Sequence, residues 1–389
     1  MAPETQLSDV TDTGTLAALA ALVAAVRQLE GLTRQVGPFA LPDGTCDQAP
    51  EQVAAVCRAL DVPLTFDSPG HDHALASLAA GIRRAQSAPA LAGLRPARAA
   101  DEARRIYAEE NAELRTHSVS RPDGSTVLAV ESGARDAPCV VMSSACAMSY
   151  RLCLPWLEAL ATDYRCIVIQ TRGTGEPVTD PADFDRYGSG VAEQAGDILA
   201  VMDALDTGPV HLMGLCGGAV PALVAAAREP GRVRSLSLWH ADLELGPDAE
   251  KSEHQTNLRA LLDMAGESRD MAGWMRDKLA SGPMKGVPDS IGPLAVRPYA
   301  TTELFYRYAK LTGATMHWDS RATANQVKQP TLIVTSRDDH TAHPAGSRRL
   351  AQLLPGSRLV VTDHGSHLDA FNGTSKQVGT LISFLRSLE

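Results

Sequence analysis

The feature that most constrains the fold is an alternation of short apolar runs and helical segments, which begins after about residue 113. Short apolar runs bounded by turn residues are typical of buried strands. Strands that alternate with helices favour a doubly wound, mostly parallel sheet, so we expect an α/β fold class. The expected strands are 114–120, 126–131, 139–142, 166–169, 210–213, 233–239, 331–335 and 358–361, and the expected helices are 150–161, 191–205, 219–228, 345–354 and 375–388.

The alternation is absent from two parts of the chain. Residues 1–105 contain several segments with helical spacing and no alternating strands, so we expect a helical N-terminal extension. Residues 241–325 are too long for a simple crossover, and we expect them to form a helical lid over the carboxyl edge of the sheet. The α/β core then comprises residues 106–240 and 326–389. The helical segments expected in the lid are 255–264, 271–280 and 302–311.

Apolar helical faces in the extension predict that it packs against something. The run 16–26 carries no charge, which indicates burial on several sides. We expect these faces to pack against the core, the lid or a second subunit, so a homo-oligomer is one expectation. The expected helices are 16–35, 50–60 and 73–85, the expected loops are 37–46 and 63–70, and the charged segment 95–105 is expected to link or dock.

The composition argues against several classes of protein. Lys and Arg number 36 against 46 Asp and Glu, a formal charge of −10, so we expect no binding to nucleic acid or to an anionic membrane. The chain has no G-x-G-x-x-G or P-loop motif and no Cys/His set with zinc spacing. We therefore expect neither a cofactor nor a metal.

Cysteine usage and the N-terminal segment predict the compartment. Seven cysteines with no C-x-x-C pair cannot form a complete disulfide framework, which favours a reducing environment. The N-terminus is acidic where a signal peptide is basic. Arg27 and Glu30 make the apolar run too short to span a bilayer. We expect a cytoplasmic protein.

The segment Gly214-Leu215-Cys216-Gly217-Gly218 carries the strongest chemical signal in the chain. It lies directly after an expected strand and directly before an expected helix. A G-x-nucleophile-x-G turn at that place lifts the central side chain clear of the sheet toward the helix N-terminus. The helix dipole there favours a thiolate. Cys216 is therefore the candidate nucleophile, and the alternative is a buried core cysteine on a tight turn.

Candidate acids and bases follow the later strands in the order that such a nucleophile requires. Asp338 and Asp339 follow the strand 331–335, and His364 and His367 follow the strand 358–361. Asp242, after the strand 233–239, is an alternative acid. An aspartate, a histidine and the thiol would complete a triad for nucleophilic catalysis.

This arrangement resembles the α/β-hydrolase superfamily over residues 113–389, apart from the lid. The family's G-x-x-D turn, with Ser336 in the glycine position, selects Asp339, and its G-x-H element selects His367. Arg172-Gly173-Thr174-Gly175 resembles the family's R-G-x-G turn. The resemblance implies a Cys216–His367–Asp339 triad and an oxyanion donor at Gly217. A second donor would come from Ser144 or Ala145, where many members have His-Gly.

Cysteine in place of the usual serine bears on the reaction. Family members with a cysteine include polyester synthases, dienelactone hydrolases and some thioesterase domains. Residues 214–218, together with Asp339-His340 followed by Pro344, are most similar to the polyester-synthase type. The resemblance implies acyl transfer or ester and thioester cleavage on a bulky acyl group, carried by CoA or a carrier protein, in secondary metabolism. A lyase or eliminase and a non-enzymatic binding module of the same fold are the alternatives.

Overall fold

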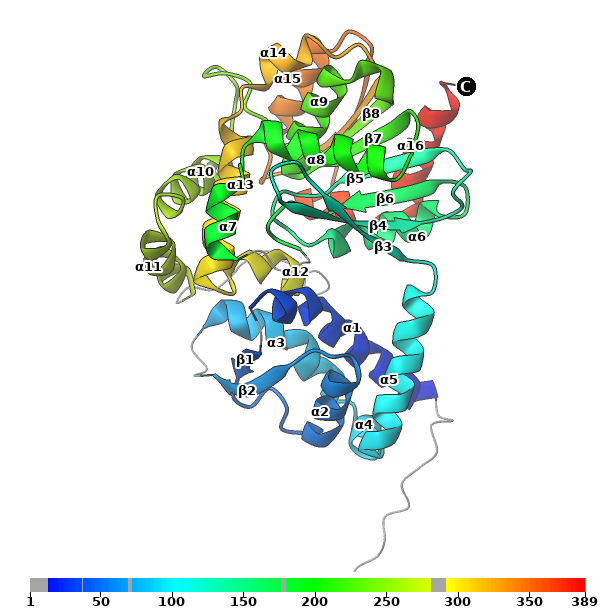
Figure 1. Ribbon diagram of the computed structural model, residues 1–389, viewed down its shortest axis with the longest axis vertical. Coiled ribbons are helices and arrows are strands. Elements are labelled where there is room, and N and C mark those ends of the chain that lie inside the picture. The colour runs from blue at the N-terminus through cyan, green and yellow to red at the C-terminus, as the bar shows by residue number, and fades with distance from the viewer. Residues whose placement is uncertain (1–12, 37, 69–71, 176–179, 281–291, 389) are drawn as a thin grey trace, which may run out of the picture. The chain divides into compact units, whose positions relative to one another are not determined.

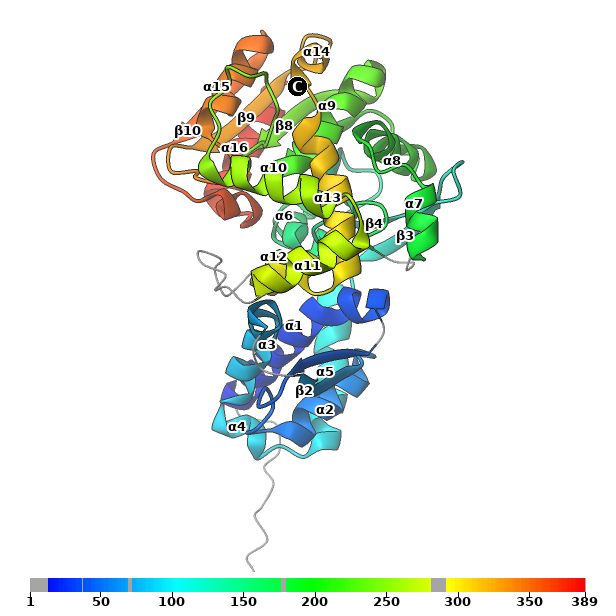
Figure 2. The same cartoon turned by 90° about the vertical axis from the view of Figure 1, so that its left-hand side faces the viewer.

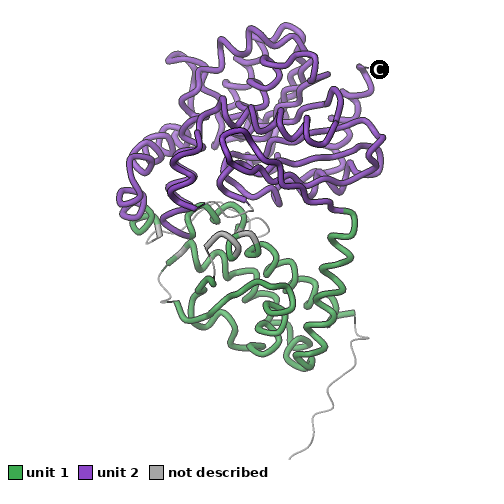
Figure 3. The backbone as a smooth tube through the Cα atoms, viewed as in Figure 1, with its two compact units in different colours: residues 1–113, 276–300 green, residues 114–275, 301–389 purple. Residues whose placement is uncertain are grey.

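The computed structural model describes residues 13–36, 38–68, 72–175, 180–280 and 292–388 of the chain. The chain forms two compact units, one of residues 1–113 and 276–300 and the other of residues 114–275 and 301–389 (Figure 3). Residues 1–12 of the expected extension and 281–291 of the expected lid lie outside the described residues.

The larger unit is built on an eight-stranded sheet in the order β10-β9-β8-β7-β5-β6-β4-β3 (Figure 1). β4 pairs antiparallel with β3 and with β6, and the other neighbouring strands pair in parallel. The expected α/β class with a mostly parallel sheet is therefore confirmed. The strands are β3 (Arg115–Ser120), β4 (Thr126–Ser132), β5 (Cys139–Ser143), β6 (Arg165–Ile169), β7 (Val210–Leu215), β8 (Val233–Trp239), β9 (Thr331–Ser336) and β10 (Ser357–Thr362).

Helices cover both faces of the sheet because the central strands are apolar on both sides. On β8, Leu236 and Leu238 belong to the buried cluster that contains the inner faces of α8 and α9. The next residue, Trp239, points to the other face and packs edge-on against Trp156 of α6, with ring centroids 4.9 Å apart. The helices and turns of this layered core are η1 (Tyr150–Cys153), α6 (Leu154–Leu160), α7 (Pro181–Arg186), α8 (Val191–Ala204), η2 (Cys216–Gly218), α9 (Ala219–Arg228), η3 (Pro230–Arg232), α15 (Pro344–Leu353), η5 (His367–Phe371) and α16 (Ser375–Arg386).

The strand order determines where chemistry can take place. The chain passes from β5 to β6 on one side and then to β7 on the other, so the order reverses next to β5. Ligands in open α/β sheets bind at the carboxyl ends of the strands, at such a reversal. Every expected triad residue follows the carboxyl end of a strand in this sheet.

The segment expected as a lid is divided between the two units. The larger unit contains α10 (Glu253–Ala265), most of α11 (Arg269–Ala280), α13 (Thr302–His317) and α14 (Ser320–Ala324). In this unit α10 packs on α13 (Figure 2). The helix α13 also packs on η2. Residues 276–300, with α12 (Gly292–Val296) and η4 (Arg297–Tyr299), belong instead to the smaller unit. The physical reason is that α12 packs on α1 and α3 of the N-terminal segment.

The smaller unit is mainly helical, with α1 packed against each of α2, α3, α4 and α5. Leu19, Leu22, Val23 and Val26 of α1 are fully buried, so its uncharged run lies in the core of this unit. Arg27, also buried, donates a hydrogen bond to the Asn111 side chain at 2.7 Å and so ties α1 to α5. The elements are α1 (Thr13–Val36), β1 (Phe39–Pro42), α2 (Pro50–Ala59), β2 (Leu64–Ser68), α3 (His73–Gln86), α4 (Pro89–Ala92) and α5 (Pro96–Asn111).

Two expectations for this unit, the loops 37–46 and 63–70, are wrong in detail. The described parts of the expected loops 37–46 and 63–70 contain β1 and β2, which pair in parallel as a small sheet. Such short strands, each carrying turn-type residues, show no clear alternation, and the buried Phe39 and Leu41 draw the first of them into the core. The charged segment 95–105 is the first part of the long helix α5, stabilised by pairs such as Arg105 with Glu109.

None of the described helices has a stretch both long and apolar enough to cross a bilayer.

A truncation tests the role of the N-terminal segment. A protein that starts at residue 106 lacks α1 to α4 and most of α5, so the buried Leu294 and Val296 of α12 lose the helices on which they pack. Exposed apolar surface of this kind drives association. We expect a poorly soluble protein or a changed oligomeric state in size-exclusion chromatography with light scattering. A soluble truncated protein of unchanged association state and unchanged kinetics would show that the segment is dispensable.

Candidate active site

Cys216 lies where β7 ends and η2 begins, and its backbone has a φ of 52°. This left-handed conformation is rare for a residue with a side chain, and such strain clusters at functional sites. The two flanking glycines are needed for close packing. A Cβ at Gly214 would lie 2.5 Å from the Cα of Ala219, and one at Gly218 would lie 2.2 Å from the carbonyl oxygen of Ser144. The turn therefore requires glycine on both sides of the cysteine.

Exposure separates Cys216 from the other cysteines. All seven lie within the described residues and all are free, and six are buried while Cys216 is partly exposed. Burial raises the pKa of Cys46, Cys57, Cys139, Cys146 and Cys153 to about 12, which keeps these thiols protonated and unreactive.

Asp339 and His367 lie together at the carboxyl ends of β9 and β10. The Nδ1 atom of His367 is 3.0 Å from Oδ2 of Asp339, and both side chains are buried. Ser336, which replaces the glycine of the G-x-x-D turn, donates a hydrogen bond from its hydroxyl to the carbonyl of Gly365. This bond ties the loop of the acid to the loop of the histidine.

Electrostatics favour a charged His367. Burial by itself lowers the pKa of His367, but the adjacent Cys216 sulfur and the Asp339 carboxylate outweigh burial and hold that pKa well above its ordinary value. Burial likewise tends to raise the pKa of Asp339, but hydrogen bonds with His240 and His367 hold it well below its usual range. Both shifts favour the charged forms of Asp339 and His367, and an imidazolium beside a sulfur atom would stabilise a thiolate nucleophile.

The other residues considered from the sequence are outside the hydrogen-bonded pair of Asp339 and His367. The Asp242 carboxylate accepts a hydrogen bond from Gln255 and forms none with His367 among the described contacts. His364 is exposed and pairs with Asp338, its Nδ1 2.9 Å from a carboxylate oxygen. His340 is exposed as well. Of the three carboxylates weighed as the acid, the one that contacts His367 is Asp339.

His240 is a member of the site that sequence reasoning missed. It follows β8 directly, is buried, and places its Nδ1 2.8 Å from Oδ2 of Asp339, the oxygen that His367 also contacts. Oδ1 of Asp339 accepts the backbone N–H groups of Thr341 and Ala342 at 2.9 and 2.8 Å. Both carboxylate oxygens thus accept two bonds each. The sequence signal that could have identified His240 is its place directly after a strand, in the same turn as Asp242.

These side chains are also of the kind that bind metal ions. Ligand atoms of His240, Asp339 and His367 lie within 4.8 Å of one another. A metal there would occupy the Asp339 oxygen and the imidazole nitrogen that a triad uses, so the two roles exclude each other.

The loop after β5 lies against the nucleophile turn, as an oxyanion loop must. Ser144 and Ala145 are buried in it, and Gly217 is buried on the other side. The backbone of this loop after β5 also contacts α13, because Thr312 of that helix donates a hydrogen bond to the carbonyl of Cys146 at 3.2 Å. The loop and the nucleophile turn are in close contact, because a Cβ at Gly218 would lie 2.2 Å from the carbonyl oxygen of Ser144.

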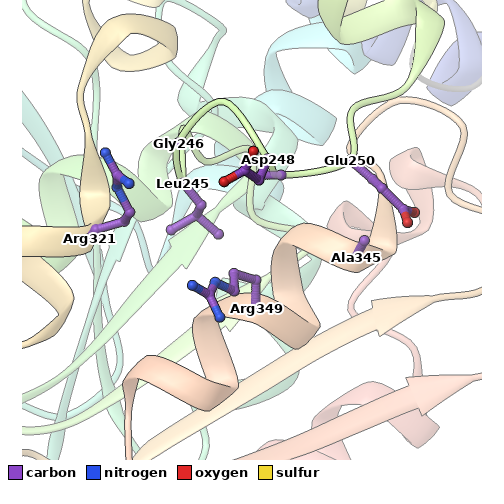
Figure 4. Close-up of a pocket in the computed structure, with 8 residues that line it drawn as sticks. Leu245, Gly246, Asp248, Glu250, Arg321, Ala345 and Arg349 are labelled. Atoms are coloured by element: carbon purple, nitrogen blue, oxygen red, sulfur yellow. The ribbon is translucent and has the colours of Figure 1, made fainter.

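A second hollow in the larger unit lacks a nucleophile. It encloses about 360 Å³, and the guanidinium groups of Arg321 and Arg349 enter it from α14 and α15, opposite the loop of Asp248 (Figure 4). None of the residues that line it belongs to the expected triad.

Comparison with known proteins decides the family. The sequence profile described as the alpha/beta hydrolase fold matches residues 138–374. This chain belongs to the α/β-hydrolase fold family. The Arg172 of its R-G-x-G turn has a structural place, since two of its nitrogens donate hydrogen bonds to Asp197 of α8 at 2.6 and 2.7 Å.

Two relatives and one solved structure of the same fold illustrate the range of similar proteins. RutD of Pseudomonas savastanoi pv. phaseolicola, named as a carbamate hydrolase, is 27% identical over 256 residues, which cover 65% of this chain and 95% of that protein. An L-allo-isoleucyltransferase of Pseudomonas savastanoi pv. glycinea is 27% identical over 197 residues, covering 50% of this chain and 69% of that one. The enol-lactonase of Burkholderia xenovorans, a solved structure, superposes with a TM-score of 0.54 at 22% identity, covering 70% of this chain and all of that one (100%).

His240 provides a test of the site's geometry in this α/β hydrolase. Replacing His240→Ala removes one of two imidazoles on Oδ2 of Asp339, and losing a hydrogen bond to a charged group costs about 1.5 kcal/mol or more. We expect kcat/KM to fall about tenfold in steady-state kinetics, with partial recovery in His240→Asn, because the asparagine amide keeps a donor near the position of Nδ1. An unchanged rate in His240→Ala would contradict a positioning role. A rate lost on dialysis against EDTA and restored by zinc would instead assign the three side chains to a metal.

Proposed function

We propose that this protein catalyses acyl transfer, or cleavage of thioesters and esters, through a covalent acyl intermediate on Cys216. The observation that carries the proposal is the environment of Cys216. It is the partly exposed cysteine, held at positive φ at the head of a helix, beside an imidazole whose pKa is well above its ordinary value. Each of these features is typical of a nucleophile and unusual for a packing residue.

In the first half-reaction the thiolate of Cys216 attacks the carbonyl carbon of the acyl substrate. The electron pair of the carbonyl moves onto its oxygen, which the backbone N–H groups of Gly217 and of Ser144 or Ala145 stabilise. When the carbonyl re-forms, the bond to the leaving group breaks and the leaving group takes a proton from His367. The acyl group is then held as a thioester on Cys216.

In the second half-reaction an acceptor attacks that thioester. The acceptor is water for hydrolysis and a thiol, amine or hydroxyl for transfer, and it gives its proton to His367, which is neutral at that stage. Collapse releases the acyl product and returns Cys216 as a thiolate beside a protonated His367. Asp339 holds the imidazole in one tautomer throughout and stabilises its charged form.

The names of the relatives support acyl chemistry and leave the acceptor open. Carbamate hydrolysis and isoleucyl transfer both displace a group at a carbonyl carbon, one with water and the other with a second acceptor. A thioester intermediate keeps its acyl group activated, which favours the transfer reaction for a cysteine enzyme. We propose a small-molecule acyl substrate delivered on CoA or a carrier protein, in secondary metabolism, and the seven free cysteines support a reducing, cytoplasmic location.

Intact-protein mass spectrometry tests the proposal. The full-length protein is mixed with a panel of N-acetylcysteamine thioesters and simple esters and sampled over time. We expect a mass increase that equals one acyl group. Its disappearance in buffer would identify a hydrolase, and its persistence in buffer with discharge onto added pantetheine would identify a transferase.

Two outcomes would contradict the proposal. Turnover of a substrate without any adduct, or with an adduct that survives in Cys216→Ala, would show that this thiol is not the acyl carrier. The absence of both turnover and adducts across the panel would favour a lyase or a binding module of the same fold.

A further inference from the structure

Asp242 is a carboxylate in the site that the proposed mechanism does not use. It follows β8 by three residues, and its backbone N–H donates a hydrogen bond to the carbonyl of Cys216 at 3.4 Å. The side chain is half-buried, as is Cys216 itself. The backbone bond and the shared partial exposure place Asp242 beside the nucleophile turn.

Gln255 of α10 fixes the orientation of this carboxylate. The Oε1 atom of Gln255 accepts the backbone N–H groups of Ser252 and His343, each at 3.0 Å. The amide nitrogen must then point the other way, and it donates to Oδ1 of Asp242 at 2.6 Å. Among the described residues this is the one hydrogen bond of the Asp242 carboxyl group, so Oδ2 is left for a ligand.

The groups that can neutralise the charge of Asp242 are imidazoles. Among the described contacts no lysine or arginine forms an ion pair with it, and the charged groups that act on it are His367, His254 and Asp339. Burial raises its pKa, and the neighbouring Asp339 carboxylate adds to the rise. His367 is already paired with Asp339, so a half-buried carboxylate at Asp242 gains from a cation that a substrate brings to it.

The same carboxylate lies close to the reacting atoms. It acts electrostatically on His367 and on the thiol of Cys146, and a Cβ at Gly217 would lie 3.5 Å from that thiol. The substituents next to the carbonyl of an acyl group on Cys216 would therefore lie near Asp242. This placement fits a substrate that has a positively charged group on the carbon next to the acyl carbonyl.

We propose that Asp242 binds the ammonium group of an α-aminoacyl substrate, so that the acyl group carried by Cys216 is an amino acid. This inference rests on the proposed function and narrows its substrate class. The contact is a charge-assisted hydrogen bond from the substrate ammonium to Oδ2, with Gln255 holding Oδ1. A substrate without the amine would leave the carboxylate unpaired on binding.

Matched thioester pairs test the inference. The probes are alanyl and propanoyl, and isoleucyl and 3-methylpentanoyl, thioesters of N-acetylcysteamine, which differ within each pair by the amine. At about pH 6.5, where an α-amine is mostly protonated, we expect the full-length protein to be acylated at least tenfold faster by the aminoacyl member. Asp242→Asn should reduce that preference at least tenfold, while the asparagine oxygen still accepts the bond from Gln255.

Asp338→Asn is the control, because Asp338 is an exposed acid one residue from Asp339, and this variant should keep both the rate and the preference. Thermal denaturation of each variant checks the fold. Equal acylation by the two members of each pair in the wild type, or an equal loss for both in Asp242→Asn, would overturn the inference while leaving acyl-Cys216 chemistry in place. No acylation by any probe, in wild type or variants, would overturn both.

Discussion

Cys216→Ala is expected to abolish turnover while leaving the protein folded. Without the sulfur there is no atom to hold the acyl group, and loss of a nucleophile in a triad lowers kcat by about 10⁴-fold or more. The fold should persist, because alanine is smaller than cysteine and the strain of the turn belongs to its backbone. Steady-state kinetics with the best substrate of the thioester panel, together with circular dichroism, measures both quantities.

The matched control is Cys57→Ala, which removes a buried thiol from the smaller unit. That variant should turn over at close to the wild-type rate, with some loss of stability from the small cavity. If Cys216→Ala kept most of its activity, the nucleophile would have to be sought elsewhere.

Asp339→Asn is expected to lower kcat by about 100-fold or more. In triads the carboxylate holds the histidine in the tautomer that leaves Nε2 free to act as a base, and an amide in its place favours the wrong tautomer. The fold should be retained, because an asparagine oxygen can still accept the N–H groups of Thr341 and Ala342. The pH dependence of kcat/KM should also move, since the pKa of His367 loses the support of a negative charge and falls.

Asp242→Asn serves as the comparison for that variant. With a substrate that lacks an amine it should cost less than Asp339→Asn, because Asp242 forms no hydrogen bond with His367. If Asp242→Asn were the more damaging change on such a substrate, the acid of the triad would belong after β8 and not after β9.

The fold of the larger unit can be predicted from the sequence because each pattern that indicates a strand or a helix lies within a short segment. Each central strand is a short apolar run, and each helix between strands has a clear apolar face, so the strands of the sheet were predicted to within about two residues. Cys216, Asp339 and His367 stand out for the same reason, since each lies in a short motif directly after a strand. Their catalytic roles stay a prediction.

Other features depend on contacts between distant residues. The pairing of His240 with Asp339 joins residues 99 positions apart, and the bond from Gln255 to Asp242 depends on how α10 packs. β1 and β2 are too short to show a period, and one carries a proline. Nothing local in residues 292–300 indicates that α12 and η4 pack with the N-terminal segment.

Locating the acyl group on the chain tests the central claim most directly. The full-length protein is acylated with its best thioester, quenched in acid and digested, and the adduct is located among the seven cysteines by tandem mass spectrometry. We predict one acyl group on the peptide that contains Cys216 and none on the six buried thiols. An adduct on another residue, formed at the rate of turnover, would contradict the account.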